Sequence, residues 1–256
     1  GTENRIIQFG DETFFELITV GDASAIPAHG PRLFSFGAFV RDALMRKTGL
    51  SMLVLKSADA RADAAEFVRL GIGDFEPFDF ARKGKKADGS EVEVAFSLAF
   101  AADKAAPDCA FFVCQQRFPQ NFWSTAMQSH ANGASSIARV TLVAENPSDH
   151  HIFLSAFVGE RAMRSTSFGI EIEAGRGVIE IISPEGYAFR YGEAAPETKD
   201  ATFAAMEIRV ASLEAIAAAA KAAGITLQPH AGGLNWPAHD SFATTLRFIE
   251  QGKVSA

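Results

Sequence analysis

The sequence predicts an α+β fold of tandem βαβββ units, in which a strand and a helix precede two or three antiparallel strands. Three segments that begin alike indicate the repeat. Each has a short apolar run, a polar turn, about three turns of amphipathic helix and a closing glycine. The segments begin at Leu53, Val140 and Met206. Self-similar segments of this kind are typical of repeated structural units.

Residues 1–20 read as the end of another unit. Two apolar runs, Arg5–Phe9 and Phe14–Ile18, flank the turn residues Gly10–Glu12 and predict a β-hairpin. No strand and helix precede the hairpin, so the first unit is expected to lack its opening strand and helix. Either the chain is cut short or another chain completes this unit, because an unpaired strand edge is a template for pairing.

The first complete unit spans about 50–119 and follows a separate helix expected at Phe36–Lys47. Lys83–Ser90 is a polar turn with a basic cluster. Such a cluster has the chemistry to bind a phosphate, but a solvated hairpin tip is the favoured interpretation. The elements expected in this unit are a strand and helix over 53–72 and strands over 75–80, 92–100 and 110–115.

The second and third complete units cover 137–191 and 203–250. The helix beginning at Leu213 is the clearest of the chain, because alanine has the highest helix propensity. Connectors at 119–136 and 193–200 separate the units, so we expect two domains, 1–135 and 136–256. The strands expected after the helices are 166–173, 178–183, 226–228 and 244–250.

Composition excludes several classes of protein. The net charge of −7 disfavours binding to nucleic acid, whose phosphates it would repel. No apolar run is long enough for a membrane span, and the first residues do not resemble a signal peptide. Two cysteines without a CxxC spacing favour a reducing cytoplasm. Nucleotide-binding glycine motifs and the GxSxG motif of serine hydrolases are absent from the sequence.

The order of these segments resembles the vicinal oxygen chelate superfamily, which has the glyoxalase and bleomycin-resistance fold. The resemblance is greatest to its glyoxalase-like branch, and it covers most of the chain as a pattern. It rests on Gly1–Arg5 leading into Phe14–Ile18, on Phe111–Arg117, and on His130–Ala134 before a repeat strand. The resemblance implies units paired into two incomplete antiparallel barrels, each of which cups a small ligand.

Enzymes of that superfamily are typically metal-dependent, with a His on the first strand and a Glu on the last strand of each unit. In this sequence the corresponding His positions fall near Met52, Arg139 and Ala205, which are poor ligands for a hard cation. A divalent metal (Zn, Ni, Fe or Mn) held by Glu16 and Gln116 remains open, but a metal-free cup is favoured. The last-strand positions fall near Glu16, Cys114 or Gln116, Glu180 and Glu250.

Glu16 and His130 are the candidate catalytic residues. Glu16 lies between Phe15 and Leu17, so it is either a ligand anchor and general base with a raised pKa or a solvent-facing strand residue. Arg5 on the other strand of the hairpin is its expected partner. His130 has a side chain suited to proton transfer near neutral pH, although a loop-capping role is favoured.

The candidate ligand-binding residues surround the end of the run 110–116. A nucleophilic role for Cys114 would need a nearby base, and a buried thiol is the favoured interpretation. His150 and His151, at a helix start, are expected to be exposed, and metal binding by His230 and His239 is disfavoured because no third ligand has a suitable spacing. The candidate ligand-binding set is Arg5, Gln116, Cys114, Phe112 and Trp123.

Two functions remain open. The first is a glyoxalase-like protein that binds or transforms a small, partly apolar molecule; if it is an enzyme, a lyase, isomerase or dioxygenase type is expected. The second is a non-catalytic protein that sequesters a ligand, as bleomycin-resistance relatives do. Metal content distinguishes them, and a homodimer is one way to complete the first barrel.

Overall fold

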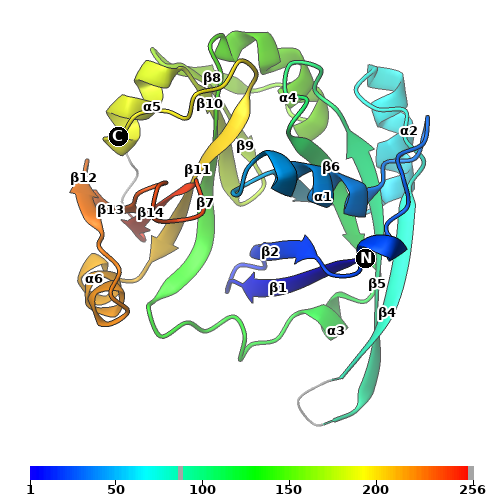
Figure 1. Cartoon of the computed structure of the whole chain (residues 1–256), viewed down its shortest axis with the longest axis horizontal. Coiled ribbons are helices and arrows are strands. Elements are labelled where there is room, and N and C mark those ends of the chain that lie inside the picture. Colours follow the sequence, from blue (N-terminus) through cyan, green and yellow to red (C-terminus); the bar gives the residue numbers. More distant parts are fainter. Residues whose placement is uncertain (86–88, 253–256) are drawn as a thin grey trace.

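The computed structural model describes residues 1–85 and 89–252. The described residues form sheets of two, four and eight strands, with helices packed over or between them (Figure 1). The predicted α+β class is therefore confirmed. The expected turn Lys83–Ser90 falls partly on 86–88, which lie outside the described residues. No helix in the described ranges is long and apolar enough to cross a membrane.

The N-terminal segment forms the expected hairpin of β1 (Thr2–Gln8) and β2 (Phe14–Val20). The side chain of Asp11 holds its turn by accepting hydrogen bonds from the backbone N–H and the hydroxyl of Thr13, at 3.0 and 2.7 Å. One face of the hairpin packs on the C-terminal part of the eight-stranded sheet through Ile7, Phe9 and Phe15. The opposite face, which carries Glu16, is therefore turned away from that contact, since side chains alternate along a strand.

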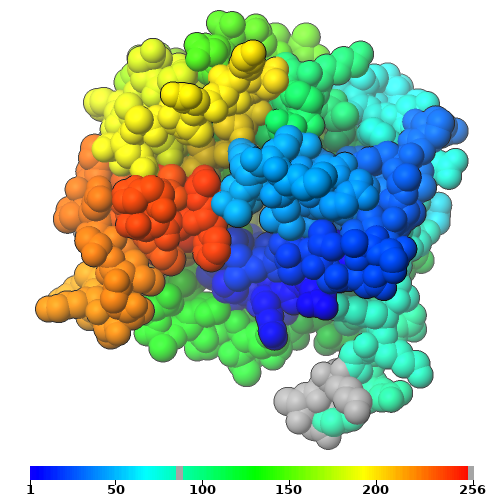
Figure 2. All heavy atoms as spheres, viewed as in Figure 1, coloured from blue at the N-terminus to red at the C-terminus, as the bar shows by residue number. Residues whose placement is uncertain are grey.

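The helix expected after the hairpin is confirmed as α1 (Phe36–Arg46), preceded by the 3₁₀ turn η1 (Ala23–Ala25). Ser35 caps α1 by accepting a hydrogen bond from the backbone N–H of Ala38. The segment around α1 lies between the hairpin and the red C-terminal segment on one face of the molecule (Figure 2). A hydrogen bond of 2.9 Å from the Leu50 N–H to the Thr244 hydroxyl joins these segments.

The first complete unit forms the four-stranded sheet, in the order β3-β6-β5-β4. β3 and β6 are parallel, and the other neighbours are antiparallel. Asp59 caps the helix of this unit, and Gly71 ends it with a φ of 71°, as expected for a glycine at this position. The elements are β3 (Met52–Lys56), α2 (Ala60–Leu70), β4 (Phe78–Lys85), β5 (Glu91–Ala101) and β6 (Ala110–Gln116).

The two remaining units share the eight-stranded sheet, in which β7 and β11 pair antiparallel. The short helix α3 (Pro119–Phe122) lies in the connector before it. The first half contains β7 (Ala134–Val143), η2 (Pro147–His150), α4 (His151–Val158), β8 (Met163–Ser165), β9 (Gly169–Ala174) and β10 (Gly177–Ile182). After α5 (Pro184–Tyr191) come β11 (Thr202–Val210), α6 (Leu213–Ala222), β12 (Gln228–His230), β13 (Gly233–Trp236) and β14 (Thr245–Glu250).

Strand order shows the repeat directly. Each complete unit places its first strand beside its last and its second strand at the edge: β3-β6-β5-β4, β7-β10-β9-β8 and β11-β14-β13-β12. In each unit the first and last strands are parallel, because the helix between the first and second strands carries the chain across. The repeated segments seen in the sequence therefore correspond to repeated topology.

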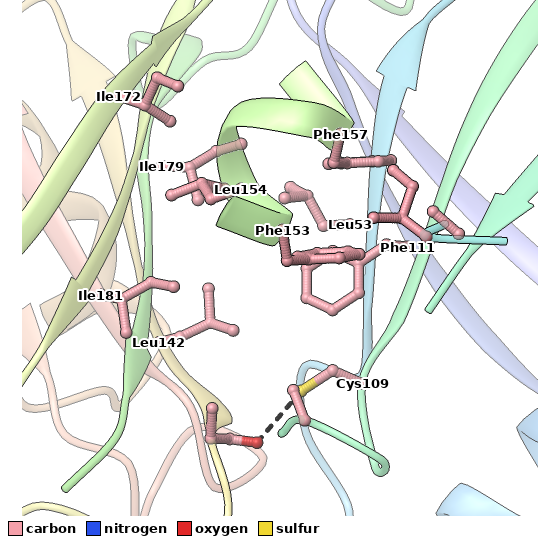
Figure 3. Packing of buried hydrophobic residues seen from close by; sticks show 14 of the residues in the cluster. Leu53, Cys109, Phe111, Leu142, Phe153, Leu154, Phe157, Ile172, Ile179 and Ile181 are labelled. Carbon is pink, nitrogen blue, oxygen red and sulfur yellow. Dashed lines mark hydrogen bonds between the residues drawn. The ribbon is translucent and has the colours of Figure 1, made fainter. Parts of the chain in front are cut away.

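The largest hydrophobic core joins the four-stranded and eight-stranded sheets (Figure 3). Phe111 of β6 lies at its centre, with ring centroids 4.8 Å from Phe153, 5.5 Å from Phe157 and 5.6 Å from Phe203. These partners belong to α4 and β11 of the eight-stranded part. Much of the phenylalanine excess in the sequence therefore lies in cores that hold the sheets together.

Three elements differ from the expectations. The strand expected over 166–173 begins only at Gly169, as β9, and the short strand β8 lies before the expected range; the hydroxyl of Thr166 accepts the N–H groups of Phe168 and Gly169 and turns the chain between them. The strand expected over 226–228 lies two residues later, as β12, and its partner β13 forms where no strand was expected. The helix α5 was not predicted, although Ser183 caps it and Gly192 ends it.

Candidate functional site

The first candidate site lies where the hairpin meets the four-stranded sheet. Alternate side chains of β5 and β6 on one face form an aromatic-rich cluster with the connector. The ring of Phe122 connects the hairpin to the four-stranded sheet. Its centroid lies 5.3 Å from that of Phe14 on the hairpin and 5.6 Å from that of Phe96 on β5. Phe14 and Glu16 occupy the same face of β2, two residues apart. We call this site the first cup.

Glu16 is a half-buried carboxylate in the first cup. Burial raises its pKa above the ordinary value, and this outweighs the hydrogen bond donated by the Asn4 amide and the positive charge of Arg82. Arg82 is exposed on β4 and borders a cavity of about 430 Å³ between β4 and β5. The carboxylate thus lies on the same strand face as Phe14 and within the electrostatic influence of Arg82.

Cys114 and Gln116 occupy the β6 side of the first cup. Burial, together with the charge of Glu16, raises the pKa of the Cys114 thiol to about 12, so the thiol keeps its proton near neutral pH. The indole N–H of Trp123 donates a 3.0 Å hydrogen bond to the side-chain carbonyl of Gln116. Phe112 lies on the same face of β6, two residues before Cys114, and is buried.

The buried amide of Gln8 fixes the connector over the first cup. Its Nε2 donates to the Phe122 carbonyl at 2.7 Å, and its Oε1 accepts the N–H of Ser124 at 3.0 Å. These bonds place Trp123 beside Phe14, with ring centroids 6.0 Å apart. A single residue of the hairpin therefore positions an aromatic wall of the site.

The eight-stranded sheet carries a second set of inward-facing polar residues, which we call the second cup. The guanidinium of Arg139 on β7 lies at its centre. It is 3.1 Å from Glu171, 3.4 Å from Glu180 and 3.3 Å from Glu207. Arg190 lies 2.9 Å from Glu180, and Arg247 lies 3.4 Å from Glu207. Arg164 also pairs with Glu171, so the three carboxylates are shared among four guanidinium groups.

Burial and charge oppose each other within the second cup. Burial alone would lower the pKa of Arg139, but the carboxylates of Glu180 and Glu207 raise it, so this side chain remains a cation. For Glu180, burial outweighs Arg139 and Arg190 and raises the pKa. Both glutamates and Arg247 have side chains only 1% exposed, so the network is closed to solvent.

The helix α5 fills the second cup. The hydroxyl of Tyr187 hydrogen-bonds to Thr245 at 2.6 Å, and that of Tyr191 to Thr141 at 2.7 Å. Both tyrosines are at most 2% exposed. Because α5 packs on the inward face of the strands, the second cup is occupied by the protein's own side chains.

A protein-family model described as a glyoxalase-like domain matches residues 1–158, which is more than half of the chain. The chain belongs to the glyoxalase-like domain family. The resemblance of the sequence to the vicinal oxygen chelate superfamily is thereby confirmed. No curated protein matches the sequence.

Solved structures resemble this glyoxalase-like protein in fold. A hypothetical protein from Staphylococcus aureus is 12% identical with a TM-score of 0.63, and the match covers 98% of this chain and 86% of that one. A mutant of 4-hydroxymandelate synthase from Streptomyces coelicolor is 10% identical with a TM-score of 0.58, with coverages of 100% and 82%. Identities this low show the shared fold alone.

The structure gathers most of the sequence candidates of the glyoxalase-like protein in the first cup. Glu16, Cys114, Gln116, Phe112 and Trp123 all contribute to it. Their roles in catalysis and binding remain proposals.

Arg5 and His130 lie elsewhere. Arg5 pairs with Leu17, so it is on the opposite face of the hairpin from Glu16, and the expected ion pair is wrong. Asn4 takes its place. His130 forms a 2.6 Å hydrogen bond through Nε2 with the Gln8 carbonyl and packs against Phe9, which belongs to the other core.

The other histidines follow the expectations in part. His150 was expected to be exposed but is 3% exposed, because its Nδ1 contacts Asp103 at 2.5 Å in the core between the sheets. His151 is exposed. His230 contacts the Phe189 carbonyl at 2.9 Å, and His239 contacts Asp240 at 3.3 Å.

The residues of the first cup do not fit a divalent metal. Glu16 is the carboxylate there, Cys114 keeps its proton, Asn4 and Gln116 offer neutral amides, and Arg82 adds positive charge. No cluster of three or more His, Cys, Asp and Glu side chains suited to a metal exists within residues 1–85 and 89–252. In the second cup, Arg139 fills the centre of the carboxylates.

Proposed function

We propose that the first cup binds a small, partly apolar molecule and that Glu16 transfers a proton to and from it. The observation that carries the proposal is a half-buried carboxylate with a raised pKa, set between aromatic rings and Arg82. A raised pKa brings a carboxyl group closer to neutral pH, where a general acid or base is most effective. Carboxyl groups whose pKa is raised by burial are frequent at functional sites.

The chemistry suited to this arrangement is proton transfer at a carbon next to a carbonyl group. The Glu16 carboxylate takes a proton from that carbon, and the carbonyl oxygen gains negative charge. The Gln116 amide and the Arg82 guanidinium are the donors available to stabilise that charge. Glu16 then returns the proton to the same or a neighbouring carbon, which corresponds to an isomerase-type reaction.

Deuterium exchange tests this proposal without the natural substrate. Phenylacetone, a small aromatic ketone, serves as the probe, and its α-protons are followed by proton NMR in D₂O. The protein is expected to accelerate exchange, and Glu16→Gln to slow the accelerated part by about 10²–10⁴-fold. Glu173→Gln removes an exposed strand carboxylate and serves as the control. Equal exchange rates for Glu16→Gln and the control would reject Glu16 as the base.

Sequestration without catalysis is the second candidate function. The protonated Cys114 thiol and the poor fit for a metal support it, because the cup then offers neither a thiolate nucleophile nor a metal centre. Such a protein would bind phenylacetone without accelerating exchange. Elemental analysis before and after chelator treatment adds an independent criterion, since stoichiometric Zn, Ni, Fe or Mn bound through Glu16 would contradict this candidate.

Three further expectations are retained as proposals. The division into 1–135 and 136–256 is supported by the start of the eight-stranded sheet at β7. A homodimer is supported by β2, whose described strand neighbour is β1 alone. A reducing cytoplasmic location is supported by two free cysteines. Light scattering of the purified protein tests the dimer directly.

A further inference from the structure

The face of the four-stranded sheet that forms the first cup continues outward onto its edge strand, β4. In the antiparallel register of β4 and β5, Phe80 is directly opposite Phe96, and Arg82 is directly opposite Val94. Residues paired in this way carry their side chains on the same face of the sheet. Because Phe96 and Val94 belong to the aromatic-rich cluster of the first cup, Phe80 and Arg82 lie on the same face as that cluster.

Two aromatic rings of β4 remain partly uncovered on this face. Phe78 is 37% exposed and Phe80 is 40% exposed. The ring of Phe80 stacks on that of Phe96 with centroids 5.0 Å apart, and the Phe78 and Phe80 centroids are 5.7 Å apart. The buried cluster thus continues into exposed aromatic surface, which an apolar group of a ligand would remove from water.

Arg82 is the charged residue that β4 adds to this face. Its side chain is exposed, and within residues 1–85 and 89–252 no ion pair or hydrogen bond holds its guanidinium. Its charge acts on Glu16, but the hydrogen bond to the Glu16 carboxylate comes from Asn4. A guanidinium can bind a carboxylate through two parallel N–H groups, and those of Arg82 are available to a ligand.

The carboxylates of the β4–β5 hairpin have a cation of their own. The ammonium of Lys83 lies 3.7 Å from Glu91, and Lys83 is opposite Glu93 in the register. Side chains alternate along a strand, so this group belongs to the opposite face of the hairpin from Arg82. Arg82 is therefore left without a carboxylate partner from its own hairpin.

We infer that the ligand of the first cup is a small aromatic carboxylate, with its ring against Phe78 and Phe80 and its carboxylate on Arg82. The inference rests on the proposed function in taking the first cup as the binding site, but it does not require proton transfer by Glu16. A carboxylate held on Arg82 would fix the orientation of the ligand relative to Glu16.

Phenylacetate and its neutral counterpart phenylacetamide test this inference, because they differ in charge but hardly in shape. NMR titrations of the intact chain are expected to show that phenylacetate binds about threefold to tenfold more tightly, as for a partly screened ion pair. Its ring protons should contact the rings of Phe78 and Phe80, and the preference should decrease with added salt. Equal affinities, or contacts confined to other residues, would overturn the inference.

Matched variants separate the charge of Arg82 from the apolar contact. Arg82→Gln should reduce the affinity for phenylacetate to that for phenylacetamide. Arg5→Gln removes an equal charge from the face of the N-terminal hairpin opposite Glu16, and it should leave the preference unchanged. Phe80→Leu should weaken the binding of both compounds by a similar factor. All three side chains are exposed, so these variants are expected to fold. A preference that survives in Arg82→Gln, or is lost equally in Arg5→Gln, would contradict the site.

Glu16→Gln separates this inference from the proposed proton transfer. The variant should keep the preference for phenylacetate, because Arg82 remains, while it loses the accelerated exchange of phenylacetone. Preference for phenylacetate in a native chain that does not accelerate exchange would support this inference and reject the proton transfer. Accelerated exchange with equal affinities for phenylacetate and phenylacetamide would support the proton transfer and overturn this inference.

Discussion

The buried carboxylates of the first and second cups differ in their partners and in their exposure to solvent. Glu16 in the first cup has one amide donor and one nearby guanidinium, and it remains half-buried. Glu180 and Glu207 in the second cup are closed off and share Arg139. The first arrangement leaves a carboxylate half-buried, whereas the second pairs its carboxylates with buried guanidinium groups, although Oε1 of Glu180 and Oε1 of Glu207 have no hydrogen bond.

Ionisation of Glu16 is expected to lower the free energy of unfolding. Because its pKa is raised in the folded protein, the folded chain binds this proton more tightly than the unfolded chain. The penalty is absent below the unfolded pKa of about 4.5, grows as the pH rises toward the folded pKa, and is complete above it. Glu16→Gln should therefore gain stability relative to the native chain between low and neutral pH.

Urea unfolding at a series of pH values measures this change. Glu173→Gln, on the exposed edge of β9, provides the comparison because it removes a carboxylate from a strand without burial. An equal pH dependence for both variants would show that Glu16 titrates as an ordinary exposed carboxyl group.

Removal of Arg139 is expected to destabilise the protein by about 3–5 kcal/mol, the usual cost of leaving buried charges without their partner. The variant Arg139→Ala leaves Glu171, Glu180 and Glu207 without their central cation. Arg69→Ala, which breaks an exposed pair with Glu66 on α2, should change the free energy of unfolding far less. Urea unfolding measures both, and similar losses would contradict a structural role for the Arg139 network.

Strand alternation explains which site residues were predictable. Phe112, Cys114 and Gln116 follow a period of two along β6, so their common face could be expected from sequence. The face of Arg5 relative to Glu16 depended on the register of the hairpin, in which Ile6 and not Arg5 is opposite Glu16. The burial of His150 depended on Asp103, a partner far away in the sequence.

Among the elements, α5 is the one that fills the second cup. Its hydroxyl groups bond to β7 and β14, the two strands that flank β11, and its C-terminal end lies near β12. The sequence carried local signals for this helix, with Ser183 at the cap, Pro184 at the first position and Gly192 at the end. Its packing against the inward face of the sheet could not be predicted, because the strand and helix order of the repeated units contains no helix at this position.

The end of α5 offers a matched pair of substitutions. Gly192 and Gly159 end helices with φ values of 72° and 75°. A Cβ at Gly192 would lie 2.7 Å from Nδ1 of His230, whereas one at Gly159 would meet no atom within 4 Å. Gly159→Ala should cost about 1 kcal/mol from the backbone alone, and Gly192→Ala clearly more. Thermal unfolding measures the difference, and equal melting temperatures would argue against close packing of α5.

Across the whole molecule, the repeated units are joined by a shared core. Phe111 of the four-stranded sheet packs on Phe153, Phe157 and Phe203 of the other part (Figure 3). The repeat itself was visible in the sequence, since each unit has an apolar run, a polar turn and an amphipathic helix that is followed by a glycine. The contact between units was not, because a buried phenylalanine gives no indication of its partner.

This shared core predicts cooperative unfolding. The native chain is expected to show one calorimetric transition, and Phe111→Ala to lower its free energy of unfolding by about 3–5 kcal/mol. Phe189→Ala, which removes a ring that is 67% exposed, should have a much smaller effect. Two separate transitions in the native chain would show that the sheets unfold independently.

The central claim is that the first cup is open to a small molecule while the second is filled. The two tryptophans report on it, because the indole N–H of Trp123 lies in the first cup and Trp236 packs in the core beneath the hairpin. In ¹H–¹⁵N spectra, phenylacetone is expected to shift the Trp123 indole signal and leave those of Trp236 and of the Thr141 and Tyr191 amides unchanged. An unshifted Trp123 signal at saturating phenylacetone, or shifts confined to Thr141 and Tyr191, would contradict the claim.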